Sequence, residues 1–279
     1  MLRDFKEVKL EIHEHKLIEN GWGYDVSDNT GTFVFFYNSG SNKVKGYLSY
    51  PKNISRKLPV IIWNRGGNDK SGRLDDFLAA GMLGEIASWG YIVFASQYRD
   101  NDEFGGKDLY DVLNLINEAK LFEFSDGNRI GMEGWSRGGM MSYLALSKTN
   151  DVNTCIIIAG LADLIYNEKY NKKLGLEYKK HFGTDDKNEF VKKMKDRSAK
   201  YWPDKISENT SILFIHGTDD DKISVEDSKI MYEKLSELNK NTKYDLKIIN
   251  GGDHFLKNKK KEVALLRRSW FKSNLQFNS

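Results

Sequence analysis

The stretch GWSRGG at residues 134–139 decides the fold that we expect for this chain of 279 residues. It follows a strand-like run over 129–133 and opens a helix-like stretch over 136–147. Glycines two positions before and after Ser136 allow a sharp turn from strand to helix, where larger side chains would collide with either element. Such a turn exposes the serine hydroxyl as a nucleophile and directs the backbone N–H of Arg137 toward a developing oxyanion. The alternative is a serine that only caps the helix.

An acid and a base follow this serine in the order that such a turn predicts. The run SILFIHGTDDD at 211–221 is a predicted strand that leads into three adjacent aspartates at 219–221. The run NGGDHF at 250–255 follows the next predicted strand and contains His254. An imidazole can take the serine proton near neutral pH, and a carboxylate can orient the imidazole. The alternatives are an exposed turn histidine and aspartates that are solvated or cap the following helix.

A second oxyanion donor is expected in the loop after an early strand, predicted here at 58–63. The sequence WNRGGN at 63–68 occupies that place, and the Gly-Lys-Ser/Thr of a phosphate-binding loop does not follow it. Its glycines equally suit a tight turn, with or without a part in catalysis.

Short apolar runs alternate with helix-like stretches from residue 58 onward. The runs lie at 58–63, 91–95, 129–133, 154–159, 211–216 and 244–249, and the helix-like stretches at 73–88, 106–120, 136–147, 224–238 and 258–273. This alternation predicts an α/β fold, a mostly parallel sheet with helices on both faces. Before it, the runs at 32–37 and 43–50 predict a hairpin, and residues 1–30 match no pattern clearly.

Residues 161–205 interrupt the alternation with charged, helix-like sequence that is too long for an ordinary connection. We expect two or three helices above the carboxyl edge of the sheet, where α/β folds place their sites. They would form a lid, or else surface helices with no part in the site. The whole chain, 1–279, is expected to be one domain, with an N-terminal extension and hairpin over 1–57.

The composition excludes several classes of protein. The chain has 43 Lys and Arg against 40 Asp and Glu, a net charge of +3, which gives no electrostatic reason to expect nucleic acid or a membrane as partner. The single cysteine, Cys155, excludes an intramolecular disulfide and a Cys-based metal cluster. His13 and His15 lack a third ligand nearby in the sequence, so no metal site is expected. No signal-peptide core or membrane span is visible, and we expect a cytoplasmic protein.

The sequence does not determine the oligomeric state. Its last predicted helix carries apolar residues that suit packing on the sheet or on a second subunit: Trp270, Phe271, Leu275 and Phe277.

Together these motifs resemble the catalytic domain of the prolyl oligopeptidase family of α/β-hydrolases, which includes dipeptidyl and acylaminoacyl peptidases. The resemblance extends from about residue 40 to the C-terminus. It rests on the motif at 134–139, on HGTDDDKI at 216–223 and on GDHF at 252–255, with support from YR at 98–99, GGKD at 105–108 and GYLSYP at 46–51. It implies an α/β-hydrolase fold.

The resemblance also implies a catalytic triad of Ser136, Asp220 and His254. In the family's His-Gly-x-x-Asp-x-x-Val pattern the acid is the fifth residue, which is Asp220 when counted from His216. Ile223 stands where the family pattern has Val.

The resemblance further directs attention to the oxyanion hole. Family members often use a tyrosine side chain just before a glycine as a donor, and this chain has Arg65 there. We expect Arg137 to donate from its backbone, together with Arg65, through its side chain or backbone, or the backbone of Gly66. The hypothesis favours the Arg65 side chain, because a cation at this place would stabilise an oxyanion.

The chain departs from the family pattern in its N-terminal region. Family peptidases usually carry a long N-terminal β-propeller, and the 57 residues before the first core strand are too few for one. The predicted function is therefore a serine hydrolase that cleaves an ester or amide bond of a small acyl or short peptide substrate through an acyl-enzyme, without a cofactor. The alternative is a catalytically silent ligand-binding protein on the same fold.

Overall fold

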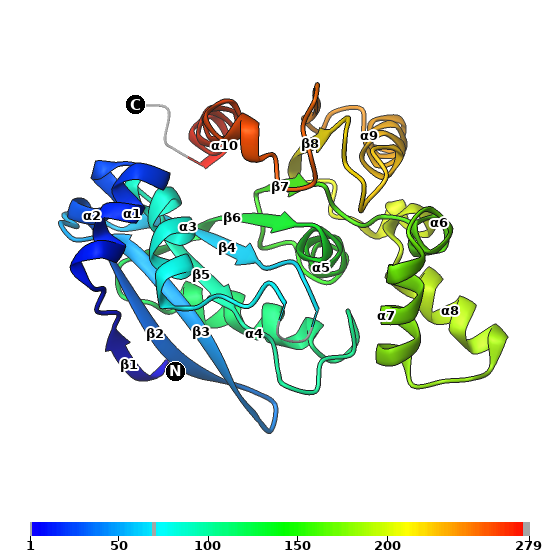
Figure 1. Ribbon diagram of the computed structural model, residues 1–279, viewed down its shortest axis with the longest axis horizontal. Coiled ribbons are helices and arrows are strands. Elements are labelled where there is room, and N and C mark those ends of the chain that lie inside the picture. Colours follow the sequence, from blue (N-terminus) through cyan, green and yellow to red (C-terminus); the bar gives the residue numbers. More distant parts are fainter. Residues whose placement is uncertain (1, 69–70, 276–279) are drawn as a thin grey trace.

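One sheet runs through the molecule (Figure 1), and its strand order positions the site. The computed structural model describes residues 2–68 and 71–275, apart from the side chain of residue 3. Within these residues nine strands pair in the order β1-β2-β3-β5-β4-β6-β7-β8-β9. The pairs β1–β2, β2–β3 and β3–β5 are antiparallel, and all the others are parallel. The α/β class expected from the sequence is confirmed.

The predicted runs and helices are found with small shifts at their ends. The strands are β1 (Arg3–Glu7), β2 (Thr30–Ser39), β3 (Asn42–Pro51), β4 (Leu58–Asn64), β5 (Ile92–Ser96), β6 (Ser125–Trp135), β7 (Thr154–Ile158), β8 (Ser211–Gly217) and β9 (Tyr244–Ile249). The helices are α1 (Ile12–Trp22), α2 (Tyr24–Asn29), α3 (Asp76–Ser88), α4 (Leu109–Lys120), α5 (Arg137–Leu146), α6 (Leu164–Tyr170), α7 (Lys172–Phe182), α8 (Lys187–Arg197), α9 (Glu226–Leu238) and α10 (Lys260–Leu275).

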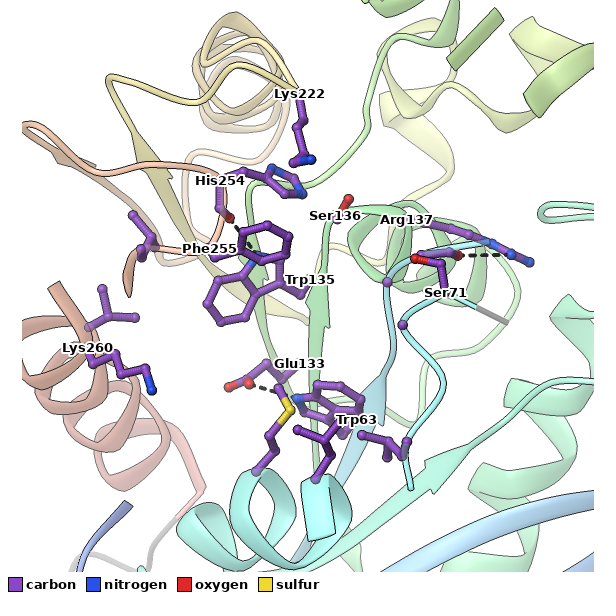
Figure 2. Close-up of a pocket in the computed structure, with 18 of the residues that line it drawn as sticks. Trp63, Ser71, Glu133, Trp135, Ser136, Arg137, Lys222, His254, Phe255 and Lys260 are labelled. Atoms are coloured by element: carbon purple, nitrogen blue, oxygen red, sulfur yellow. Dashed lines mark hydrogen bonds between the residues drawn. The ribbon is translucent and has the colours of Figure 1, made fainter. Parts of the chain in front are cut away.

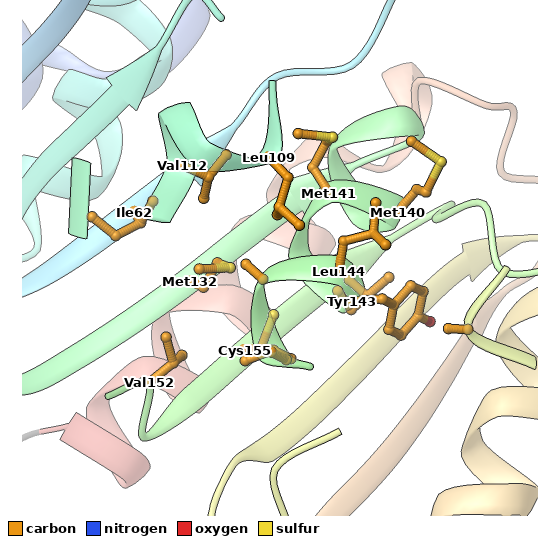
Figure 3. Packing of buried hydrophobic residues seen from close by; sticks show 14 of the residues in the cluster. Ile62, Leu109, Val112, Met132, Met140, Met141, Tyr143, Leu144, Val152 and Cys155 are labelled. Carbon is orange, nitrogen blue, oxygen red and sulfur yellow. The ribbon is translucent and has the colours of Figure 1, made fainter. Parts of the chain in front are cut away.

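Helices cover both faces of the central strands, which is why β4, β5 and β7 are apolar at most positions. Side chains alternate between the faces, so Ile62 of β4 packs in the core beneath α4 and α5, while Ile61 packs with α3 and α10. In Figure 3, Met141 of α5 belongs to the cluster that includes Met132 of β6 and Cys155 of β7. Full burial of a side chain of this size contributes about 1.5–3 kcal/mol to the free energy of folding.

The segment predicted as an insertion forms helices α6, α7 and α8 between β7 and β8. Figure 1 shows them beyond the carboxyl ends of β4 and β6, on the side of the sheet where α5 begins. The parallel strands therefore deliver their loops to the edge that these helices flank.

The N-terminal residues, which the sequence left unassigned, form β1, α1 and α2. Strand β1 extends the sheet next to β2, while Ile18 and Val26 pack against Ala80 of α3 in a small cluster of their own. The ring of Trp22 lies against Gly81 of α3, where an added Cβ would come within 2.8 Å of it. The extension is thus a layer on the outside of α3.

The last helix packs on the sheet. Trp270, Phe271 and Leu275 are buried in the core beneath α10, and Phe277 lies outside the described residues. Among the described residues, no helix has both the length and the apolar character that crossing a membrane requires.

Candidate active site

The turn at Ser136 has the geometry that its glycines predict. Ser136 lies between β6 and α5 with φ 57° and ψ −120°, a conformation that a residue with a side chain adopts only where its surroundings enforce it. A Cβ on Gly134 would collide with the carbonyl oxygen of Gly138, and one on Gly138 would collide with the carbonyl oxygen of Asn64. Glycine at both places therefore lets the strand and the helix approach closely and present the hydroxyl.

His254 and Asp220 form a buried pair at the carboxyl ends of β9 and β8. Nδ1 of His254 lies 2.8 Å from Oδ2 of Asp220, and both side chains are buried. Oδ1 of Asp220 accepts hydrogen bonds from the backbone N–H groups of Lys222 and Ile223, each at 2.9 Å. With Oδ1 held by the backbone, Oδ2 faces the imidazole of His254 and orients it. The aspartates at 219 and 221 are exposed.

His216 is a second imidazole on the same carboxylate, and sequence reasoning gave it no part in the site. Its Nε2 lies 3.2 Å from Oδ2 of Asp220, and its Nδ1 lies 2.8 Å from the hydroxyl of Ser228. Burial alone would raise the pKa of Asp220, but the hydrogen bonds from His216 and His254 outweigh it and hold that pKa well below its usual range. The acid is therefore ionised at any pH near neutrality. His216 is the first residue of the HGTDDDKI motif, and this position was the sequence signal for its part in the site.

Ser136 and His254 face one another at the opening of a cleft (Figure 2). No hydrogen bond joins the two side chains among the described residues. Bonds between nucleophile and base are often long before substrate binds and tighten only in the complex. Of the predicted triad, the structure thus joins Asp220 to His254 directly and places Ser136 opposite them.

Two backbone N–H groups lie where an oxyanion hole is expected. Arg137 is the first residue of α5, and the first N–H groups of a helix have no partner within it and carry its positive dipole end. Gly66 lies against the nucleophile, since an added Cβ would lie 3.3 Å from Cβ of Ser136 and 2.9 Å from the carbonyl oxygen of Trp135. The loop after β4 reaches the serine because residue 66 is glycine.

The side chain of Arg65 requires a correction to the expectation. Its guanidinium is fully buried and donates to the carbonyl oxygen of Gln97, from Nε at 3.1 Å and from Nη2 at 3.0 Å. Nη1 donates to the carbonyl oxygen of Gly66 at 3.1 Å, and the group stacks on Tyr98 at 4.6 Å from the ring centroid. Burial lowers the pKa of Arg65 to about 10. The guanidinium holds the loop and does not line the cleft, which leaves the backbone as the donor in this loop.

The side chain of Arg137 joins three segments, which the sequence did not reveal. Nη2 lies 2.8 Å from Oδ2 of Asp108 and 3.0 Å from Oδ1 of Asp102, and Nη1 donates to the carbonyl oxygen of Gly67 at 3.2 Å. Burial disfavours the cation, but Asp108 and Asp102 outweigh it and raise the pKa of Arg137. The sequence feature that could have indicated this contact is the pair of acids, Asp102 and Asp108, in one short segment.

Metal ligands do not gather in the described part of the chain. Groups of three or more His, Cys, Asp or Glu side chains suited to a metal are absent from residues 2–68 and 71–275. His15 lies in α1 and pairs with the hydroxyl of Ser27 at 2.9 Å, far along the chain from the triad.

A cleft of about 1750 Å³ opens over the serine and the histidine. The helical insertion lines one side of it through Leu161, Leu174 and Glu177, and helices α3 and α10 line the other. A serine on a strand-to-helix turn, a carboxylate-bound imidazole and backbone donors at the edge of a mostly parallel sheet define an α/β-hydrolase of the serine hydrolase class.

Comparisons with known proteins agree with this class. The model of the prolyl oligopeptidase family matches residues 86–277. The chain is 26% identical over 221 residues to the Uncharacterized peptidase YtmA of Bacillus subtilis. This match covers 77% of this chain and 83% of that protein. It is 24% identical over 250 residues to human Dipeptidyl peptidase 8, covering 80% of this chain and 26% of that protein. Among solved structures, Pyrococcus horikoshii acylaminoacyl peptidase superposes with a TM-score of 0.76 at 22% identity, over 90% of this chain and 43% of that one.

The chain belongs to the prolyl oligopeptidase family and is an enzyme of the serine hydrolase class. The family expected from the motifs is thereby confirmed. The chain spans most of YtmA but only about a quarter of Dipeptidyl peptidase 8.

Proposed function

We propose that this enzyme cleaves an ester or amide bond of a small acyl or short peptide substrate through an acyl-enzyme. The observation that carries the proposal is the 2.8 Å contact between His254 and an ionised Asp220, opposite a serine on a strained turn. The peptidase names of the relatives support a peptide as one substrate class.

The reaction begins when Oγ of Ser136 attacks the substrate carbonyl carbon and His254 takes the hydroxyl proton at Nε2. Asp220 keeps the Nδ1–H of the imidazole directed at itself and stabilises the imidazolium that forms. The backbone N–H groups of Arg137 and Gly66 stabilise the oxyanion of the tetrahedral intermediate. Collapse of this intermediate breaks the bond to the leaving alcohol or amine, to which His254 returns the proton. Water then attacks the acyl-enzyme by the same steps, releases the acid and frees the serine.

The helical insertion has a role in this proposal as a wall that limits substrate size. Leu174 and Glu177 of α7 line the cleft beside the serine. His181 of the same helix lies 3.3 Å from Asp102, which also contacts Arg137. The lid is thus attached to the residues that hold the nucleophile turn.

The test is covalent labelling with a fluorophosphonate, followed by mass spectrometry. We expect one adduct, on Ser136, and none on a folded Ser136→Ala variant. Unlabelled enzyme from the same preparation is then compared on p-nitrophenyl esters and on aminoacyl and dipeptidyl anilides to separate esterase from peptidase activity. Absence of any adduct on well-folded wild-type protein would overturn the proposal.

A further inference from the structure

The cleft has a second arm that the triad does not use. From Ser136 it passes Trp135 and continues along the sheet face between α3 and α10. Its walls are formed by Trp63 and Trp135 from the strands, Met82 and Trp89 from the α3 side, and Val263 from α10. Figure 2 shows Trp135 between His254 on one side and Glu133 with Trp63 on the other. We call this space the helix arm.

The floor of the helix arm contains charged groups that already satisfy one another. Arg267 donates to both oxygens of Glu133, at 2.9 and 2.8 Å, and to Glu85 at 2.6 Å. The indole N–H of Trp63 donates to Glu133 at 3.1 Å, and that of Trp135 donates to the carbonyl oxygen of His254 at 3.1 Å. The groups that line the floor are therefore committed to each other.

Because these groups are already hydrogen-bonded to one another, they offer few partners to a ligand, and this affects which kind of ligand can bind. A peptide chain brings an N–H and a C=O at every residue, and burying them without partners is unfavourable. A hydrocarbon chain needs no partners and gains from leaving water against aromatic walls. The floor and the aromatic walls of the helix arm therefore favour an aliphatic chain over a polypeptide, although the charged side chains of Glu19, Lys261 and Arg268 also line the cleft.

The N-terminal extension also lines the helix arm. Residues 19–23 line it, and the ammonium of Lys260 lies 5.3 Å from the ring centroid of Trp22. This contact joins α1 to α10 across the arm. The N-terminal extension thus contributes to the lining of the arm, which is continuous with the cleft at the nucleophile.

We propose that the helix arm binds the aliphatic acyl chain of the substrate, so that esters with medium-length chains are preferred to acetyl esters. The inference rests on the proposed function, because the chain is held there while its carbonyl carbon is bonded to Ser136. The leaving group then lies on the lid side, near Lys222, which Figure 2 shows on the side of His254 away from Trp135.

The experiment is a series of p-nitrophenyl esters from acetate to octanoate. Each methylene buried in the arm raises kcat/KM by about fourfold. Burial of three of the six methylenes that octanoate adds to acetate therefore gives about 60-fold. We expect an octanoate-to-acetate ratio of kcat/KM of that order for the wild type. In Met82→Trp, whose larger side chain fills the arm, the ratio is expected to fall toward one.

A matched control is Leu238→Trp, which introduces the same side chain on α9 at a position that is 51% exposed. It should keep the wild-type ratio. The ratio also separates the arm from folding, because a general loss of active protein lowers both rates equally. A wild-type ratio below about five, or a Met82→Trp ratio equal to the wild type, would overturn the inference.

A binding measurement separates this inference from the proposed function. Tryptophan fluorescence of Ser136→Ala is followed on addition of methyl octanoate, since four of the six tryptophans line the helix arm. A saturable change without fluorophosphonate labelling of the wild type would support the arm and overturn the hydrolase. Labelling at Ser136 with a flat ester series and no fluorescence change would overturn the arm alone.

Discussion

Replacing Asp220 by Asn tests the triad at the point where the sequence offered three candidates. The carboxylate receives two backbone N–H groups at Oδ1, and the imidazoles of His254 and His216 at Oδ2. An asparagine would keep its oxygen toward the two backbone donors, which leaves its NH₂ facing Nδ1 of His254. Because two donors cannot face each other, the imidazole proton moves to Nε2. The ring then presents a proton to Ser136 and cannot accept one.

The size of the loss follows from this tautomer change. Where an Asp-to-Asn change forces the wrong tautomer in such a triad, turnover falls by roughly 10⁴-fold, or ~5 kcal/mol in activation free energy. Asp219→Asn and Asp221→Asn are the controls, since both residues are exposed, and we expect their turnover within about twofold of the wild type.

The assay is hydrolysis of p-nitrophenyl acetate, with circular dichroism to verify folding of each variant. If the Asp220 variant is folded and loses less than tenfold, or if all three variants lose equally, the assignment of the acid is refuted.

Three further predictions concern the loop after β4 and the acid. Gly66→Ala should lower turnover by about 10–10² with the fold intact, because the new methyl lies 2.9 Å from the carbonyl oxygen of Trp135 and pushes the loop from the serine; unchanged ester hydrolysis would remove this loop from the oxyanion hole. Arg65→Ala should lower the free energy of unfolding by about 2–4 kcal/mol in urea titrations, since it leaves a buried carbonyl oxygen without its charged donor; lost turnover at unaltered stability would instead favour the side-chain donor. The depressed pKa of Asp220 means that its ionised form stabilises the fold above about pH 4, and that this contribution disappears as the pH falls through the folded pKa. The stability difference between wild type and Asp220→Asn should therefore stay constant from pH 7 to about 4 and shrink as the pH falls below about 4. A difference that stays constant below pH 4 would contradict the depressed pKa.

The sheet and the position of His254 were predictable because their signals are local, whereas the choice of Asp220 among three adjacent aspartates came from the family resemblance. A buried parallel strand is a short apolar run, and the chain places each acid or base just after such a run. The glycines at 134 and 138 carry information of the same kind, because backbone crowding excludes every larger residue. At these positions a few adjacent residues are enough to predict the local structure.

The direction of Arg65 was not predictable in this way. The sequence shows a cation before a glycine, but Gln97 and Tyr98, more than thirty residues later, determine where the guanidinium points. The same holds for Arg137 and its acids at 102 and 108. A long side chain has many directions, and only the folded neighbours select one.

The N-terminal elements β1, α1 and α2 were not predicted, for a different reason. Helix α1 contacts the rest of the molecule through a narrow apolar strip, of which only Ile18 is fully buried. With so few apolar positions in the helix, no periodic pattern stands out above its charged residues.

Part of the lining of the helix arm comes from a segment of the chain that precedes all three triad residues. The family model begins at residue 86, whereas Trp22, Trp63 and Met82, which shape the helix arm, all come earlier in the chain. Mutations in the earlier part can reshape the arm without touching the nucleophile, the base or the acid. Relatives that share every triad residue can therefore differ in the acyl group that they accept.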